Sequence, residues 1–145
     1  MSWDRLLSCA LSIKWTPFGL ATLDANGKVK FPKLPGKAGL YQFRIQGPKG
    51  DFGRYVGETD NLQRRFAHYR NPRPTQATNL RINALVKEVL STGGTIEIAV
   101  VVNDASITRD GQKEMADLTE KNIRRLFENF VLVADRAYDI FDLNK

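Results

Sequence analysis

The sequence predicts an α+β fold: a small mixed or antiparallel β-sheet of about three core strands, flanked by helices and preceded by an N-terminal extension. Two short alternating runs joined by a glycine-rich turn indicate a β-hairpin. Helical spacing of apolar residues follows in three later stretches, and a β-rich run separates the last two. At 145 residues the chain is long enough for one core. We therefore expect a single domain over residues 1–145, with an extension (1–37), a core (38–135) and a C-terminal tail (136–145).

Composition narrows the classes of function. The shares of hydrophobic (42%) and charged (26%) residues are typical of a globular protein. No apolar run approaches the roughly 18 residues that a membrane span requires, so we expect no membrane partner. The single cysteine, Cys9, excludes an internal disulfide and a Cys-rich zinc site, and we expect a cytoplasmic, intracellular protein.

The net charge of +6 is unevenly placed along the chain. Residues 42–81 hold eight Lys or Arg and three acidic residues, a net charge of +5, while the remaining residues hold 14 basic and 13 acidic residues. A polyanion such as nucleic acid is the natural partner of such a segment. The alternative is a basic surface that serves only solubility.

The N-terminal segment is expected to contain one helix and one small hairpin. Residues 2–13 are predicted to form a short first helix, with a serine as its cap. Residues 20–23 and 28–31 are predicted to be extended, and Asn26-Gly27 between them is a strong hairpin-turn signal. Prolines then keep the chain irregular up to the next strand.

A second hairpin is predicted over residues 40–57. Residues 40–45 alternate, which places Tyr41, Phe43 and Ile45 on one face of a strand and Leu40, Gln42 and Arg44 on the other. Residues 47–53 have the composition of a turn, and residues 54–57 return as the second strand. The short connection predicts antiparallel pairing.

A short helix follows the hairpin, with Thr59 or Asp60 as its cap. Its apolar stripe should consist of Leu62, Phe66 and Tyr69. Arg65 falls on the same stripe, where an arginine is costly to bury unless an anion or a carboxylate meets it. Either its guanidinium holds a phosphate, or its stem covers apolar surface while its head reaches water.

Three further elements are predicted: a helix over residues 80–90, a central strand over 95–102 and a helix over 112–134. The core-facing positions of the last helix should be Ile123, Leu126, Phe127, Phe130, Val131 and Ala134. Glu128 lies about 100° around the helix from Phe127. At this edge of the apolar stripe, Glu128 either lines a cleft or is a solvated residue at the core boundary.

The spacing of these residues resembles the GIY-YIG nuclease family. The chain has the triplets Gly39-Leu40-Tyr41 and Tyr55-Val56-Gly57, followed by Arg65, Tyr69 and a Glu on the late helix, Glu128. The resemblance covers residues 38–135 and implies a GIY-YIG-like catalytic core. It implies structural roles for Gly39 and Gly57, and catalytic roles for Tyr41, Tyr55, Arg65, Tyr69 and Glu128.

The activity that this resemblance implies is hydrolysis of phosphodiester bonds by a divalent-metal-dependent endonuclease with one metal ion. Glu128 would bind Mg²⁺ or Mn²⁺, with Glu114 and Glu120 as rival ligands. Arg65 would hold a phosphate oxygen and stabilise the charge of the transition state. Tyr41 is the predicted general base, although a pKa of about 10 makes an ordinary tyrosine a poor base. The other two tyrosines would orient water and phosphate.

The predicted partner is DNA, double-stranded or branched, in repair, restriction or mobile-element biology. The predicted contacts to its phosphates are Lys49, Arg54, Arg64, His68, Arg70 and Arg73. No recognition helix or zinc finger is evident, so a partner protein or a homodimer is a further expectation.

Glu58 departs from the family pattern. An acid beside a phosphate site would repel substrate unless it binds metal or pairs with Arg54 or Arg64. Two alternatives to the endonuclease therefore stay open. One is a catalytically inactive, nuclease-like module that binds nucleic acid, and the other is a small interaction protein whose basic region binds an acidic partner.

Overall fold

A four-stranded antiparallel sheet lies at the centre of the fold. The computed structural model describes residues 3–135, and the expected tail over 136–145 lies outside them. The strand order is β2-β7-β5-β6, formed by Thr16–Leu20, Thr95–Val101, Gly39–Gln46 and Phe52–Thr59. The predicted α+β class and the antiparallel hairpin β5–β6 are confirmed, and β7 is a central strand as predicted.

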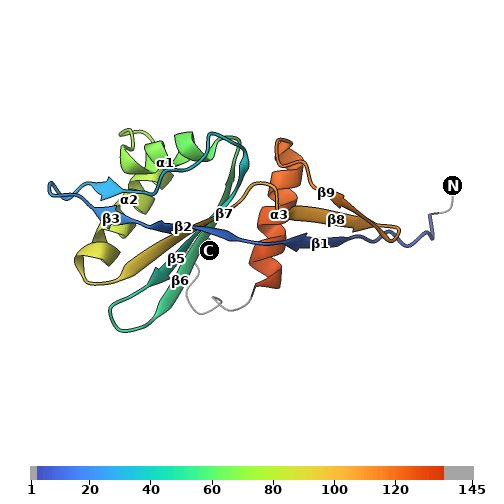
Figure 1. The fold of residues 1–145 in the computed structure, drawn as a ribbon, viewed down its shortest axis with the longest axis horizontal. Helices are drawn as coiled ribbons and strands as arrows, with labels where there is room; N and C mark the ends of the chain where they lie inside the picture. Colours follow the sequence, from blue (N-terminus) through green and yellow to red (C-terminus); the bar gives the residue numbers. More distant parts are fainter. Residues whose placement is uncertain (1–2, 136–145) are drawn as a thin grey trace.

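Helices cover both faces of this sheet. The helices α1 (Leu62–Arg70) and α2 (Ala77–Ser91) pack on the face that carries Tyr41. The helix α3 (Lys121–Ala134) packs on the opposite face, where Phe127 and the Leu40 side chain share a second apolar core. Figure 1 shows α1 and α2 toward one end of the long axis and α3 toward the other. Because successive side chains of a strand point to opposite faces, β5 contributes to both cores.

A second antiparallel sheet lies at the same end of the molecule as α3 (Figure 1). Its order is β1-β8-β9, formed by Ala10–Ile13, Ala105–Arg109 and Gln112–Met115. Asp110 and Gly111, between β8 and β9, both have positive φ (51° and 76°), as a tight hairpin turn requires. This sheet packs against α3 through its apolar side chains and completes the second core.

Residues 1–37, which the sequence sets apart as an extension, supply strands to three sheets. The small hairpin of β3 (Thr22–Leu23) and β4 (Val29–Lys30) is turned by Gly27, which has a φ of 76°. This confirms the predicted pair of extended pieces. The strand β1 pairs with β8, and β2 pairs with β7, so the extension is built into the fold rather than appended to it.

Two helix predictions are wrong in part or in full. The predicted helix over residues 2–13 is wrong, because residues 10–13 form β1 and no other described residue of that segment is helical. The predicted helix over 112–134 is wrong in its first third, where β9 pairs with β8, and the helix begins at Lys121. The first error arises because the partner strand β8 is remote from β1 in sequence, and pairing with it overrides local helical preference. The second error has a local cause: a two-residue turn at Asp110 and Gly111 folds β9 back onto β8, a hairpin signal that the prediction did not use.

Within residues 3–135, no helix combines the length and the apolar character needed to cross a bilayer.

Candidate active site

The hairpin places Tyr41 and Tyr55 on the same face of the central sheet. Tyr55 lies opposite Phe43, two residues beyond Tyr41, and the rings of Tyr41 and Tyr55 have centroids 6.4 Å apart. Gly57 lies opposite Tyr41, and a methyl group there would overlap the Tyr41 ring and hydroxyl. A methyl group at Gly39 would likewise overlap the backbone carbonyl of the neighbouring strand. Both glycines therefore give the space that the tyrosine and the sheet occupy.

The helix α1 brings Tyr69 to the two strand tyrosines. As predicted, its buried stripe consists of Leu62, Phe66 and Tyr69. The hydroxyls of Tyr69 and Tyr41 are hydrogen-bonded at 2.5 Å, and these side chains are 0% and 2% exposed. Asn83 of α2 donates to the backbone carbonyl of Tyr69 at 2.8 Å, which fixes the end of α1. The tyrosine pair is thus held from the sheet and from both helices of this face.

Burial makes these two hydroxyls weak acids. Burial raises the pKa of Tyr41 well above its ordinary value, and the neighbouring Tyr69 and Tyr55 oxygens raise it further. Burial raises the pKa of Tyr69 in the same way. Arg65 lowers both values, but its effect is smaller than that of burial. Both tyrosines are therefore neutral hydrogen-bonding groups at neutral pH.

Arg65 lies beside all three tyrosines, half-buried on α1. Burial acts to lower its pKa, yet the oxygens of Tyr41 and Tyr69, with a hydrogen bond to Tyr69, raise the pKa above the ordinary value. The guanidinium is therefore held in its charged form among neutral acceptors. Its neighbours are the tyrosine hydroxyls, which leaves the charge available to an anion.

Glu128 lies on α3, which packs against the edge strand β6 on the opposite face of the sheet from α1. It is half-buried, as the edge position on its helix predicts. Partial burial raises the pKa of its carboxyl, and the charge of Glu58 raises it further. Arg125, the backbone N–H of Glu58 and Arg65 act in the other direction. The charge of Arg65 therefore acts on the Glu128 carboxyl, but less strongly than Glu58 and Arg125 do.

The two rival carboxylates lie elsewhere. Glu114 is on β9 and forms an exposed ion pair with Arg109 at 2.7 Å. Glu120 is exposed at the N-cap of α3, two turns before Glu128 on the chain. Within residues 3–135, no three His, Cys, Asp or Glu side chains are grouped as ligands of one metal ion. Magnesium, however, is often held by one or two carboxylates with water in the other positions, and Glu128 suits that mode.

Glu58 pairs with a residue that the sequence did not suggest. Its carboxylate accepts from Nε of Arg124 at 2.6 Å, so the predicted partners are wrong. Arg64 instead pairs with Asp60 on the surface, and Arg54 lies 3.8 Å from the carboxylate of Asp135. Arg124 occupies a core-facing position of α3, three residues before Phe127. An arginine at a core-facing position indicates an acidic or anionic partner, as was argued for Arg65 on the apolar stripe of α1.

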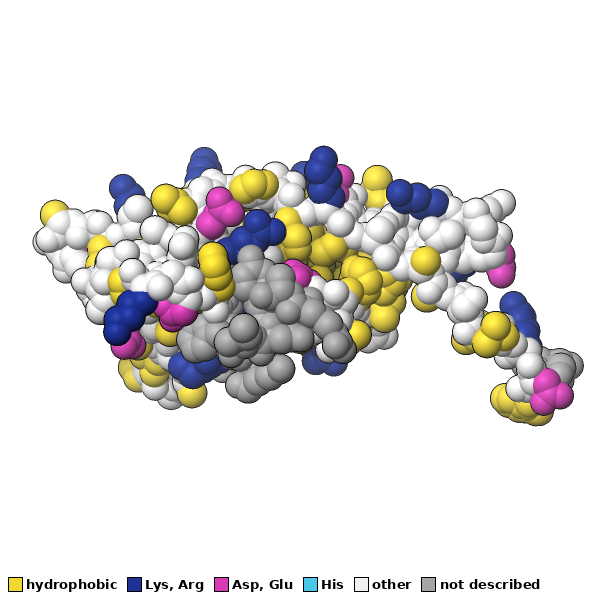
Figure 2. Space-filling view, turned by 90° about the horizontal axis from the view of Figure 1, so that it is seen from below, with side chains coloured by type: hydrophobic (Ala, Val, Ile, Leu, Met, Phe, Trp, Pro, Cys, Tyr) yellow, Lys and Arg dark blue, Asp and Glu magenta, His cyan; other side chains and the backbone are white. Residues whose placement is uncertain are grey.

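The predicted DNA contacts divide into exposed and buried groups. Lys49, Arg64, Arg70 and Arg73 are exposed, and His68 is half-buried. Arg54 is a correction: it is 0% exposed beneath α3 and donates to the carbonyl of Leu132, so its side chain is not placed to contact DNA. On the face seen in Figure 2, Lys and Arg side chains lie along the length of the molecule rather than in one cluster.

Arg81 is a further residue that sequence reasoning missed. It projects from α2, and its guanidinium carbon lies 5.9 Å from the centroid of the Tyr55 ring, within the range of a cation–π contact. No local signal predicts this contact, because Tyr55 and Arg81 belong to different elements. It adds a second cation to the tyrosine site.

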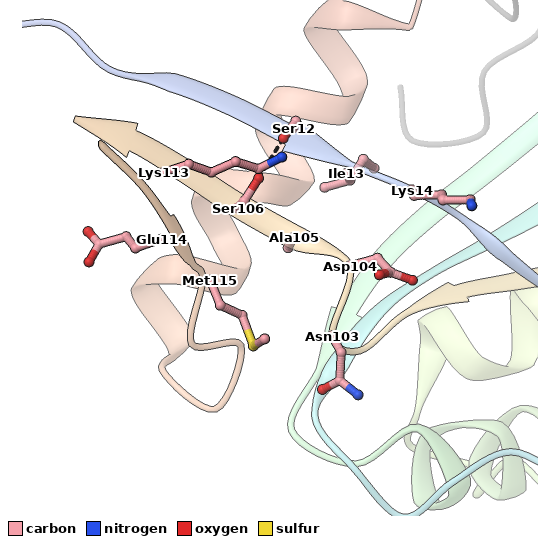
Figure 3. Close-up of a pocket in the computed structure, with 10 residues that line it drawn as sticks. All are labelled: Ser12, Ile13, Lys14, Asn103, Asp104, Ala105, Ser106, Lys113, Glu114 and Met115. Carbon is pink, nitrogen blue, oxygen red and sulfur yellow. Dashed lines mark hydrogen bonds between the residues drawn. The ribbon is translucent and has the colours of Figure 1, made fainter. Parts of the chain in front are cut away.

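A concavity on the second sheet is separate from this site (Figure 3). It has a volume of about 440 Å³ and lies over β1, β8 and β9, where the hydroxyls of Ser12 and Ser106 meet at 2.6 Å. Two lysines and two carboxylates also line it, so their charges balance. None of the five predicted catalytic residues belongs to its lining.

Comparisons with known proteins show the fold. No family model matches the chain, and no curated protein sequence matches it. Among solved structures, the chain is similar to a glutamate-to-alanine mutant of bacteriophage T4 EndoII. The sequence identity is 23%, the match covers 80% of this chain and 86% of the phage protein, and the TM-score is 0.54. The chain therefore has a fold like that of the phage protein.

Proposed function

We propose that the protein is a divalent-metal-dependent endonuclease that hydrolyses DNA phosphodiester bonds by one-metal, in-line attack of water. The observation that carries this proposal is the cluster of three tyrosines around Arg65, whose charge also acts on the Glu128 carboxyl of α3. The fold similarity to a phage endonuclease supports it. The basic excess around the hairpin and α1 supports DNA as the substrate.

Arg65 is proposed to bind a non-bridging phosphate oxygen. Its raised pKa keeps the guanidinium charged, and its planar fork of donors matches phosphate geometry. Because the tyrosines and the helix hold it in place, the charge is oriented before the substrate arrives. A preorganised cation of this kind stabilises the charge that develops in the transition state.

Glu128 is proposed to hold Mg²⁺ or Mn²⁺. A half-buried carboxylate whose charge is disfavoured by burial and by Glu58 gains from a bound cation. When bound, such an ion would neutralise charge on the scissile phosphate and the leaving oxygen. Glu128 would supply the one protein ligand, as the family resemblance implies.

Tyr41 is proposed as the general base toward the attacking water, with Tyr55 and Tyr69 orienting water and phosphate. Burial raises the pKa of Tyr41, and Arg65 is the residue that lowers it. Tyr41 therefore depends on a nearby cation to accept a proton at neutral pH. Full activity of a Tyr41→Phe protein would exclude this role.

The second candidate is a nuclease-like module that binds nucleic acid without cutting it. The specific observation that favours it is the strongly raised pKa of Tyr41, which opposes base catalysis. Salt-dependent DNA binding without metal-dependent cleavage would distinguish this function from the first.

The first experiment is nicking of supercoiled plasmid at low salt with Mg²⁺ or Mn²⁺, beside EDTA and beside Glu128→Ala and Arg65→Ala proteins. We expect cleavage that EDTA abolishes and that each substitution lowers by roughly 10²–10³-fold, as for loss of a preorganised charge-stabilising group. Glu114→Ala is the matched control, because Glu114 is paired with Arg109 on the surface. Branched DNA run beside linear duplex separates repair-like from restriction-like cutting.

Equal activity of Glu128→Ala and Glu114→Ala proteins would contradict the metal assignment. Absence of cleavage on every substrate, with binding retained in a gel shift, would favour the non-cutting module.

A further inference from the structure

Arg124 is a buried arginine whose Nε and Nη1 atoms both have close partners. It is 5% exposed on the core-facing side of α3. Its Nε donates to the Glu58 carboxylate at 2.6 Å, and its Nη1 donates to the carbonyls of Leu118 and Thr119 at 3.1 and 2.9 Å. Arg124 thus ties the segment that precedes α3, and α3 itself, to the end of β6.

Glu58 connects this arginine to the candidate active site. Its side chain is 17% exposed where it meets Arg124. Its backbone N–H donates toward the Glu128 carboxylate, and its own charge acts on that carboxylate. Arg124 and Glu128 are four residues apart on α3, so they lie on the same side of the helix, one turn apart. The carboxylates of Glu58 and Glu128 therefore act on each other, and Glu58 is paired with Arg124.

We propose that Arg124 and Glu58 are positioning residues for Glu128. Arg124 neutralises the charge of Glu58 and holds α3 against β6. Glu128 is then the carboxylate that remains available to bind a cation at the site. This inference rests on the proposed function. Loss of Arg124 leaves an unpaired carboxylate beside the phosphate site, where it repels DNA. Loss of Glu58 alone frees Arg124, which then competes with the cation for Glu128. Removing the charges of Glu58 and Arg124 together leaves the net charge beside the phosphate site as it is in the wild type.

The test compares Arg124→Met, Glu58→Gln, the double variant, and Arg124→Lys, which keeps the charge. Arg109→Met is the matched control, since it removes an exposed arginine from an ion pair outside the site. Two quantities are measured for each protein: DNA affinity in EDTA, and cleavage as a function of Mn²⁺ concentration. Thermal melts identify any variant that does not fold.

We expect Arg124→Met to lower kcat by roughly 10–100-fold, as substitutions behind metal ligands typically do. It should also weaken DNA binding in EDTA by about fivefold, because one negative charge is unmasked near the phosphate site. Glu58→Gln should raise the Mn²⁺ concentration needed for half-maximal cleavage. The double variant should bind DNA in EDTA as the wild type does, and cut better than either single variant. Arg124→Lys should retain DNA affinity while lowering kcat.

Three outcomes overturn the inference while the proposed function stands: Arg124→Met protein that cuts like the wild type, losses in the double variant equal to the product of the single losses, or DNA affinity in EDTA that does not recover in the double variant. Complete loss of cleavage in Glu58→Gln alone, with no recovery in the double variant, would make Glu58 itself a metal ligand and also overturn it. Wild-type protein that neither cuts nor binds DNA removes the proposed function, and the inference with it.

Discussion

The hydrogen bond between Tyr41 and Tyr69 joins a strand to a helix at the centre of the candidate site. Both hydroxyls are buried and hydrogen-bonded to each other, and the Tyr69 hydroxyl also interacts with Arg65 and Tyr55. Gly57 makes the space for the Tyr41 ring, and Arg65 completes the surroundings. The same contacts that position the site therefore also stabilise the fold.

We predict that Tyr41→Phe lowers the free energy of unfolding by roughly 0.5–1.5 kcal/mol at neutral pH, because one buried hydrogen bond is lost. The pH dependence has a definite sign. The folded-state pKa of both tyrosines is raised above the unfolded value, so their stabilisation is fully present below the unfolded pKa of about 10 and is lost as pH rises beyond it. Chemical denaturation over an alkaline pH series measures both effects.

The Tyr41→Phe/Tyr69→Phe double variant is the control for this prediction. Removing both hydroxyls should cost less than the sum of the single substitutions, because each single substitution already removes the hydrogen bond that the two share. It should also flatten the alkaline loss of stability. Additive losses, or an unchanged pH dependence, would contradict the paired role.

At the scale of elements, the N-cap of α1 sets the position of Arg65 in the first turn of the helix. Asn61, rather than the predicted Thr59 or Asp60, is the N-cap, and its side chain accepts from the backbone N–H of Arg64 at 3.0 Å. The Thr59 hydroxyl in turn accepts from the backbone N–H of Asn61 at 3.1 Å. The hairpin thus passes directly into the first turn of the helix.

We predict that Asn61→Ala destabilises the protein by about 1 kcal/mol, as loss of an N-cap side chain usually does. It should also lower cleavage, because the first turn of α1 sets the position of Arg65. Asp60→Ala is the matched control: it removes only the exposed ion pair with Arg64 and should leave the melting temperature nearly unchanged. Equal melting temperatures for the two variants would show that Asn61 does not act as the cap.

The helix α3 illustrates how one element serves two purposes. Phe127 and Val131 face the core, while Glu128 lies one residue around the helix at the edge of the site. Arg124 lies on the buried side and pairs with the end of β6. The register of α3 on the sheet therefore fixes both the second core and the only acidic side chain proposed to bind metal.

At the scale of the whole molecule, the fold decides which of the basic side chains are exposed. Most of the basic excess lies within residues 42–81. Within that segment Arg54 is buried under α3, whereas Arg73 is exposed in the connection between α1 and α2. Two arginines of the same basic segment therefore have different surroundings in the structure.

We predict that Arg73→Ala reduces the slope of log Kd against log salt by about 1, because one phosphate contact is lost. Arg54→Met should leave that slope unchanged and instead lower the free energy of unfolding by roughly 1–3 kcal/mol, because buried polar contacts are lost. Fluorescence anisotropy with labelled duplex DNA over a salt series measures the slope, and urea denaturation measures stability. A reduced slope for Arg54→Met would show that its side chain reaches DNA.

The sequence by itself determined the features that depend on neighbouring residues. Alternation in Gly39–Gln46 predicted which side chains share each face, the apolar stripe of α1 predicted its buried side, and Asn26-Gly27 predicted the β3–β4 turn. The spacing of the two glycine–tyrosine triplets, Arg65 and Tyr69 predicted residues that the structure brings together, because a hairpin and the following helix are local elements.

Only the tertiary structure decided the features that depend on remote partners. The strand β1 forms because it pairs with β8, which is remote in sequence, so local propensity did not predict it. Packing of α3 on β6 paired Glu58 with Arg124 and buried Arg54. The physical reason is common to all of them: a charge or a strand edge is satisfied by whichever partner the fold places beside it, and sequence spacing carries no record of that partner.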